Sequence, residues 1–316
     1  MSLRLALYGQ APLAIVCIDR LQEEGHNVKV VYAPKDGSRP DVLAAYARNL
    51  GITVVQRQFF QHKDGSPIPD ALNDYEAHEV DLNILASFTS FLPSAITDAP
   101  KHKSICYHPS LLPKYRGGHA LQWQIINAVV ETGVSIFMPD TGVDTGPIVV
   151  QKSGVKISPT ETAGSLFFNK LLPLGADAIS EAVTAIDAGT VNLTQQDETE
   201  ATFHRLINKS DATIDLKAPA AKIDRLIRGC DPQPGAHLQH GDTLLKLYDV
   251  SLQDPSNQPP GVVIAIDDGA MVLALNGGSL RIGRVRSDNG KESASAFLKR
   301  HSLEVGAQLA EINQQH

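Results

Sequence analysis

Along the first half of the chain, short continuous apolar runs alternate with stretches whose apolar residues recur every three or four positions. The runs predict buried strands and the amphipathic stretches predict helices. Strands are expected at Leu3–Tyr8, Val28–Tyr32, Thr53–Gln56, Leu82–Ala86, Ile105–Tyr107, Val134–Met138 and Ile148–Lys156, and helices at Pro12–Glu24, Asp41–Leu50, Asp70–Val80, Leu121–Val130 and Leu166–Ile186, the last interrupted by Pro173. This alternation favours an α/β fold with a parallel sheet, doubly wound at least at its start.

The pattern changes after a polar stretch at Asp187–Thr202. A helix is expected at Ala218–Arg228, and short strands then alternate with glycine-containing turns. These strands are His237–Gln239, Thr243–Gln253, Gly261–Ala265, Met271–Ala274 and Ser279–Val285. The pattern predicts a small β-barrel, so we expect one domain over residues 1–203 and a second over 204–316.

Composition is that of an ordinary soluble globular protein: 316 residues, 42% hydrophobic and 20% charged,. No apolar run approaches the roughly 20 residues needed to cross a bilayer. The N-terminal apolar run reaches Gly9 too soon to be a signal peptide,. The three cysteines are sparse and lack metal-ligand spacing, so we expect a reducing cytoplasm, no disulfide and no metal,.

The net charge of −7 is unevenly distributed. From Arg205 onward there are 13 basic and 13 acidic residues, so the whole excess of acid precedes that position. Neither part is strongly basic, which gives a weak electrostatic footprint for nucleic acid.

The first strand–turn–helix invites comparison with dinucleotide-binding folds. Its turn, Gly9-Gln10-Ala11-Pro12, lacks the glycines that let a pyrophosphate approach the backbone,. We therefore interpret this turn as structural.

Two loops carry candidate chemistry. His108 lies just past a predicted strand, and a Pro-containing loop follows it. Asp144 lies in a second loop, Pro139–Pro147, between two predicted strands. A histidine at a strand end is more often structural than catalytic, and an Asp in a Gly-rich loop usually makes an Asx turn. Spacing alone does not show that the two side chains meet.

The motifs in these loops decide the interpretation. "HPSLLPKYRGG" and the later "TGVSIFMPDTGVDTGPIVVQK" closely resemble the signature of the folate-dependent formyltransferase family. Further stretches, "PKDGSRPD" and "IRGCDPQPGA", are most similar to the hydrolase domain that begins 10-formyltetrahydrofolate dehydrogenases; methionyl-tRNA formyltransferases are also similar. The resemblance implies a Rossmann-like formyltransferase domain followed by a small OB-like β-barrel.

The resemblance also implies a site. It makes His108 and Asp144 the catalytic pair and 10-formyltetrahydrofolate the formyl donor, with no metal. It places the pterin against two segments. These consist of Thr89, Ser90, Phe91 and Leu92, and of Asp140, Thr141, Gly142 and Val143.

Cys106 departs from the family pattern, which has Asn two residues before the catalytic His. An Asn amide donates to the developing oxyanion, whereas a thiol is a weak donor. Cys106 is expected to be a small buried hydrophobe. The alternative is a nucleophile that forms a formyl thioester, since on a continuing strand it shares a face with His108.

We therefore expect hydrolysis of 10-formyltetrahydrofolate to formate and tetrahydrofolate. The first alternative is N-formyl transfer to an amine, either methionyl-tRNA, which the balanced charge of the second domain disfavours, or a small amine such as an amino sugar. The second alternative is a folate-binding protein without turnover.

Overall fold

The computed structural model describes residues 2–309 and divides them into two compact units. The first contains the described residues of Met1–Gly117, with Glu131–Val155 and Phe168–Phe203. The second contains Gly118–Val130, Lys156–Phe167 and the described residues from His204 onward. Two stretches that precede residue 203 thus group with the second unit, and the division into domains 1–203 and 204–316 stays a prediction.

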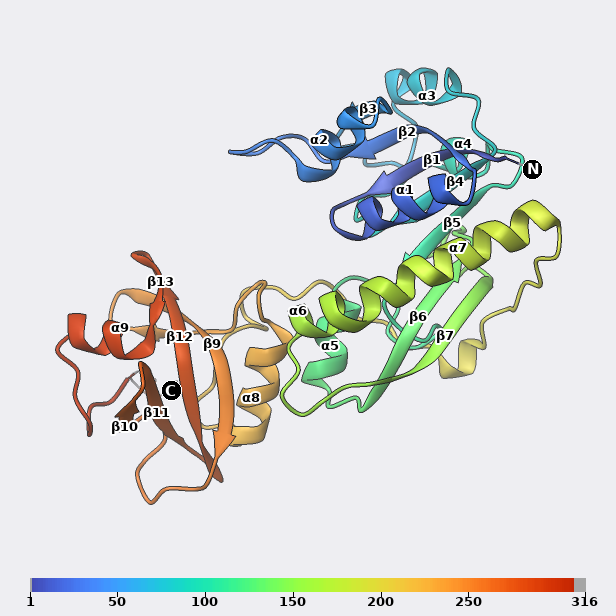
Figure 1. Cartoon of the computed structure of the whole chain (residues 1–316). Coiled ribbons are helices and arrows are strands. Elements are labelled where there is room, and N and C mark those ends of the chain that lie inside the picture. The colour runs from blue at the N-terminus through green and yellow to red at the C-terminus, as the bar shows by residue number, and fades with distance from the viewer. Residues whose placement is uncertain (1, 310–316) are drawn as a thin grey trace. The chain divides into compact units, whose positions relative to one another are not determined.

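A mixed sheet organises the first unit (Figure 1). Its strands are β1 (Arg4–Gly9), β2 (Asn27–Ala33), β3 (Thr53–Gln56), β4 (Leu82–Ala86), β5 (Ser104–His108), β6 (Glu131–Phe137) and β7 (Ile148–Lys156). Among the described residues their order is β3-β2-β1-β4-β5-β6-β7. The pairs among β1–β5 are parallel, and β6 is antiparallel to β5. This confirms the predicted α/β fold, whose strand order reverses between β1 and β4.

Gly9 ends β1 where the strand runs beside β4. A Cβ at this position would lie 2.3 Å from the carbonyl oxygen of Ala86, closer than any side chain tolerates. Glycine is therefore required here for strand packing, in keeping with the structural interpretation of this turn.

Helices α1 (Leu13–Glu23), α2 (Val42–Asn49), α3 (Pro69–Glu76), α4 (Ser94–Thr97) and α7 (Leu172–Ala188) belong to the first unit. Asp41 caps α2 by accepting a hydrogen bond from the Ala44 N–H,. Gly189, with φ of 67°, ends α7 in the left-handed conformation that favours glycine,. Helices α1 and α7 pack side by side (Figure 1).

The prediction of a single helix over Leu166–Ile186 is wrong in detail. The chain forms α6 (Ala163–Leu166), a π-helical turn at Phe167–Leu171 and then α7. Pro173 lies in the first turn of α7. Proline has no N–H and a fixed helical φ, so it is tolerated at the start of a helical segment.

The second unit is built on an antiparallel sheet. Its strands are β8 (His237–His240), β9 (Thr243–Gln253), β10 (Val263–Asp267), β11 (Ala270–Leu275), β12 (Gly278–Ser287) and β13 (Gly290–Ser293), and its helices include α5 (Ala120–Ile126), α8 (Ala220–Gly229) and α9 (Ala294–Arg300). The order is β10-β11-β12-β9-β8, with β13 on β12, and the recorded pairs are antiparallel. The expected second, β-rich part of the fold is thereby confirmed.

Arg228 forms a buried ion pair within α8 and also binds a distant stretch of chain in the second unit. Arg228 and Asp224 are both buried, with Nε and Nη2 of the arginine each 2.8 Å from Oδ2. Nη1 donates to the carbonyl of Glu161 at 2.8 Å. This contact helps explain why Lys156–Phe167 groups with the second unit.

No helix in residues 2–309 is long and apolar enough to cross a membrane.

Candidate active site

His108 is the last residue of β5 and its side chain is buried. Its Nε2 lies 2.7 Å from the carbonyl oxygen of Tyr115. Because a carbonyl oxygen only accepts, this contact assigns a proton to Nε2. The other ring nitrogen, Nδ1, is thus left for chemistry.

Asp144 faces that second nitrogen. Its Oδ2 lies 3.5 Å from His108 Nδ1 and accepts a 2.7 Å hydrogen bond from the Gly117 N–H. The residue adopts a φ of 55°, which Asp tolerates better than most side chains,. The structure therefore brings together the two residues that lie on separate loops in the sequence.

Gly146 lets the Asp144 loop close against the end of β6. A Cβ at this glycine would lie 1.7 Å from the carbonyl oxygen of Met138. The chain pairs at this point, since the Met138 N–H donates to the Pro147 carbonyl at 2.9 Å. Glycine is required because the backbone passes too closely for a side chain.

Cys106 lies two residues before His108 on the same strand and pairs with Phe137 of β6. Its side chain packs beside Leu112, Phe137 and Ile148. Burial, and secondarily the charge of Asp144, raise the pKa of the Cys106 thiol well above its usual value. A protonated thiol in apolar surroundings is a poor nucleophile. This environment favours the packing role over the thioester route.

The predicted pterin segments make their own local contacts. Thr89 Oγ1 accepts from Gln10 at 3.4 Å, and Ser90 donates to the Gln58 carbonyl at 3.4 Å. Phe91 is 67% exposed, whereas Leu92 packs against the aromatic core of the first unit.

The second segment is shaped by Asp140. Its Oδ1 accepts from the Gly142 N–H at 2.9 Å and from the Thr145 hydroxyl at 2.5 Å. Thr141 and Val143 are exposed. Neither segment contacts the other through a hydrogen bond recorded in residues 2–309, so their joint role in pterin binding stays a prediction.

Two residues next to this pair were not predicted from the sequence. Arg116 is buried and Gln196 half-buried; the Gln196 amide binds the backbone of the Asp144 loop. Gln196 lies in the polar stretch Asp187–Thr202, where the first domain was expected to end, and no hydrophobic periodicity distinguishes it from its neighbours. Arg116 stands within the "HPSLLPKYRGG" motif, and that position was its only signal.

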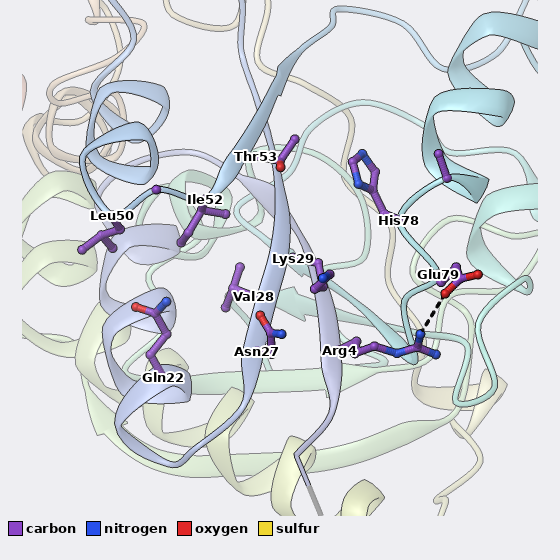
Figure 2. Close-up of a pocket in the computed structure, with 12 residues that line it drawn as sticks. Arg4, Gln22, Asn27, Val28, Lys29, Leu50, Ile52, Thr53, His78 and Glu79 are labelled. Carbon is purple, nitrogen blue, oxygen red and sulfur yellow. Dashed lines mark hydrogen bonds and ion pairs between the residues drawn. The ribbon is translucent and has the colours of Figure 1, made fainter.

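A separate hollow of about 480 Å³ lies at the other edge of the sheet, where β1, β2 and β3 begin (Figure 2). At its rim, Arg4 Nη1 lies 3.3 Å from Glu79 Oε2. Figure 2 shows this ion pair as a dashed line. None of the predicted site residues lines it. Among the described residues no group of three or more His, Cys, Asp or Glu side chains is arranged to hold a metal ion.

Comparison with known families accounts for this architecture. The family profile described as Formyl transferase matches residues 3–183, and the profile described as Formyl transferase, C-terminal domain, matches residues 206–302. The chain belongs to the formyl transferase family, which confirms the resemblance seen in its motifs.

Two relatives illustrate the range of the family. Mitochondrial 10-formyltetrahydrofolate dehydrogenase of Mus musculus is 34% identical over 92% of this chain but only 32% of its own length. The chain thus spans about a third of that relative. Methionyl-tRNA formyltransferase of Geobacter metallireducens is 31% identical over 98% of this chain and 99% of its own.

Solved structures share the fold. HypX from Aquifex aeolicus in complex with tetrahydrofolic acid superposes with a TM-score of 0.74, at 17% identity, over 96% of this chain and 48% of that one. The N-formyltransferase from Helicobacter canadensis, in complex with folinic acid and dTDP-3-aminofucose, superposes with a TM-score of 0.66 at 20% identity. That alignment covers 89% of this chain and 98% of the other. At these identities the likeness establishes the fold alone.

Proposed function

We propose that this chain hydrolyses 10-formyltetrahydrofolate to formate and tetrahydrofolate. The observation that carries the proposal is the His108–Asp144 pair, 3.5 Å apart at the edge of the sheet where β5 ends. A carboxylate beside an imidazole supplies both a proton acceptor and a donor for attack on a formyl carbon. Family membership and the folate-bound solved structures support the choice of a formyl-folate.

The roles divide between the two side chains. Asp144 Oδ2 accepts a proton from water as the water oxygen bonds to the formyl carbon. His108, protonated on Nδ1, donates to the formyl oxygen and stabilises the tetrahedral intermediate. The carbon–nitrogen bond then breaks, and the folate nitrogen takes up the proton that Asp144 removed from water. The products are tetrahydrofolate and formic acid, which ionises to formate.

Cys106 separates this chain from the transferases of the family, which have Asn at this position, and this departure supports hydrolysis over transfer. A weakly donating thiol gives the formyl oxygen little help at the position where transferases of this family have an amide. More of the stabilisation falls on His108. The 34% identity to a 10-formyltetrahydrofolate dehydrogenase agrees with this preference.

Transfer to an amine is the second candidate. The observation in its favour is that methionyl-tRNA formyltransferases match this chain over their whole length. Against a tRNA acceptor, several arginines of the second unit are neutralised by acidic neighbours: Arg205 by Asp211, Arg281 by Asp267, Arg284 by Asp249 and Arg300 by Glu292. Neutralised arginines contribute little to phosphate binding.

One assay separates these functions. Purified protein is incubated with 10-formyltetrahydrofolate alone, then with initiator methionyl-tRNA or a panel of small amines, and formate and tetrahydrofolate are measured. Formate without an acceptor supports hydrolysis. Tetrahydrofolate and a formylated amine, without formate, would replace hydrolysis by transfer. Folate binding without either product would indicate a binding protein.

A further inference from the structure

A polar segment, Thr194–Thr202, ties together the two loops that hold His108 and Asp144. At its start, Thr194 and Ile148 exchange backbone hydrogen bonds of 2.8 and 2.9 Å where β7 begins. At its end, the Thr202 carbonyl accepts from the Arg116 N–H at 2.9 Å, in the loop after β5. The segment thus spans from one site loop to the other, within the first unit.

Gln196 binds the Asp144 loop directly. Its amide nitrogen donates to the carbonyl of Asp144 at 2.9 Å and to that of Gly146 at 2.7 Å. Both bonds hold the backbone that directly follows the Asp144 Cα, the atom from which the carboxylate projects. The carboxylate then meets the Gly117 N–H and His108.

Arg116 orients that amide. Its Nε and Nη2 donate to Gln196 Oε1 at 3.0 and 2.8 Å, so the other end of the amide must be the donor,. The same guanidinium makes a two-point contact with Glu198, at 2.9 and 2.7 Å. Two-point arginine contacts are geometrically specific. The direction of the Gln196 side chain is therefore determined.

Thr202 acts on the other loop. Its hydroxyl accepts from the Tyr115 N–H at 2.8 Å. The carbonyl of the same Tyr115 accepts the hydrogen bond from His108 Nε2. Thr202 therefore holds the residue that fixes the histidine ring.

We propose that Thr194–Thr202 is a positioning strap, in which Gln196 sets the orientation of Asp144 and Thr202 sets that of His108. The inference rests on the proposed function, because it assumes that these two side chains carry the reaction. The proposal gives a positioning role to a segment that contains no catalytic residue.

The first test compares two charge-matched variants. Gln196→Glu keeps the acceptor for Arg116 but replaces the N–H donors by an oxygen facing two carbonyls. Gln195→Glu makes the same change at the exposed neighbouring residue. Misplacement of a reacting group by about 1 Å can cost roughly 10²-fold in rate. We expect Gln196→Glu to lower kcat for formate release by about ten- to a hundredfold, with Gln195→Glu unchanged.

A second readout follows the carboxylate without any turnover. Hydrogen exchange at the Gly117 amide, measured by NMR, reports whether Asp144 still accepts its bond. It should accelerate in Gln196→Glu relative to the amide of Ile84 in the buried strand β4, and stay unchanged in Gln195→Glu. Equal acceleration at both amides would mean general destabilisation and would overturn the positioning role.

Thr202 provides an independent pair of variants. This pair tests the positioning role even if Gln196→Glu does not fold. Thr202→Val has nearly the same shape but no hydroxyl, whereas Thr202→Ser retains it. We expect kcat to fall severalfold in the valine variant and to be largely restored by serine. Equal rates in both would overturn this arm of the strap.

Failure of the strap and failure of the proposed function have different signatures. A wild-type protein that releases no formate refutes hydrolysis, while Gly117 exchange still tests the strap. A wild-type protein that releases formate, together with a Gln196→Glu variant of normal rate and normal Gly117 exchange, refutes the strap alone.

Discussion

His108 ends strand β5 and Asp144 lies in the loop between β6 and β7, yet His108 Nδ1 is 3.5 Å from Asp144 Oδ2. The ring is fixed from behind by the Tyr115 carbonyl and the carboxylate by the Gly117 N–H. Both of these direct anchors come from the loop after β5.

Removing either member of the pair should abolish turnover without unfolding the protein. His108→Ala and Asp144→Asn should each reduce kcat for formate release by about 10²–10⁴-fold, the usual contribution of general acid–base groups. Tetrahydrofolate binding should persist. The control is His62→Ala, on an exposed loop. Retention of more than a tenth of the activity in either site variant contradicts the assigned roles.

Cys106 should be dispensable for turnover. Its raised pKa keeps the thiol protonated throughout the neutral range, so it should react slowly with iodoacetamide,. We expect Cys106→Ala to remain active and mass spectrometry to find no formyl adduct on the wild-type protein. An inactive alanine variant combined with an adduct would establish the thioester route instead.

Restoring the family's amide at this position gives a complementary result. Cys106→Asn buries a polar group, which costs about 1–3 kcal/mol where partners are lacking. We expect a modest loss of stability, with transfer to amines unchanged or improved. Thermal unfolding and the amine-panel assay measure the two effects, and a clear loss of transfer would show that the amide cannot reach the formyl oxygen.

The Asp144 loop should tolerate no side chain at Gly146. Gly146→Ala places a Cβ against the Met138 carbonyl, and overpacking of this kind typically costs about 1–3 kcal/mol,. Activity should fall as well, since the loop carries Asp144. Gly37→Ala is the matched control, because nothing lies within 4 Å of its Cβ. Equal free energies of unfolding for the two variants in urea would show that the Asp144 loop accommodates a side chain at Gly146, against this prediction.

His119 should make stability depend on pH. Burial lowers the pKa of His119, and its Nδ1 accepts a 2.9 Å hydrogen bond from the Ile207 N–H. The unfolded chain, with a His pKa of about 6.5, therefore binds the proton more readily. The stabilisation that neutral His119 gives the folded state is therefore complete above about pH 6.5 and is lost as the pH falls below that value. The free energy of unfolding should decline more steeply between about pH 6.5 and 5 in wild type than in His119→Gln; identical slopes would exclude this residue.

Much of the fold and the central pair could be predicted from local sequence. Buried strands such as Leu82–Ala86 are continuous apolar runs, and His108 and Asp144 stand in recognisable motifs. Gln196 could not be found this way, because it joins Arg116 across 80 positions through side-chain bonds that leave no periodicity. Helix α9 and strand β13 were missed because they are short and begin in polar sequence.

The central claim is that water attacks the formyl carbon at the His108–Asp144 pair. The most direct measurement is turnover of 10-formyltetrahydrofolate in water labelled with heavy oxygen, without any amine, followed by mass analysis of the formate. We predict formate carrying one labelled oxygen, produced by wild type and lost in Asp144→Asn. Absence of formate from the wild type, or equal formation of labelled formate by the Asp144→Asn variant, would contradict the account.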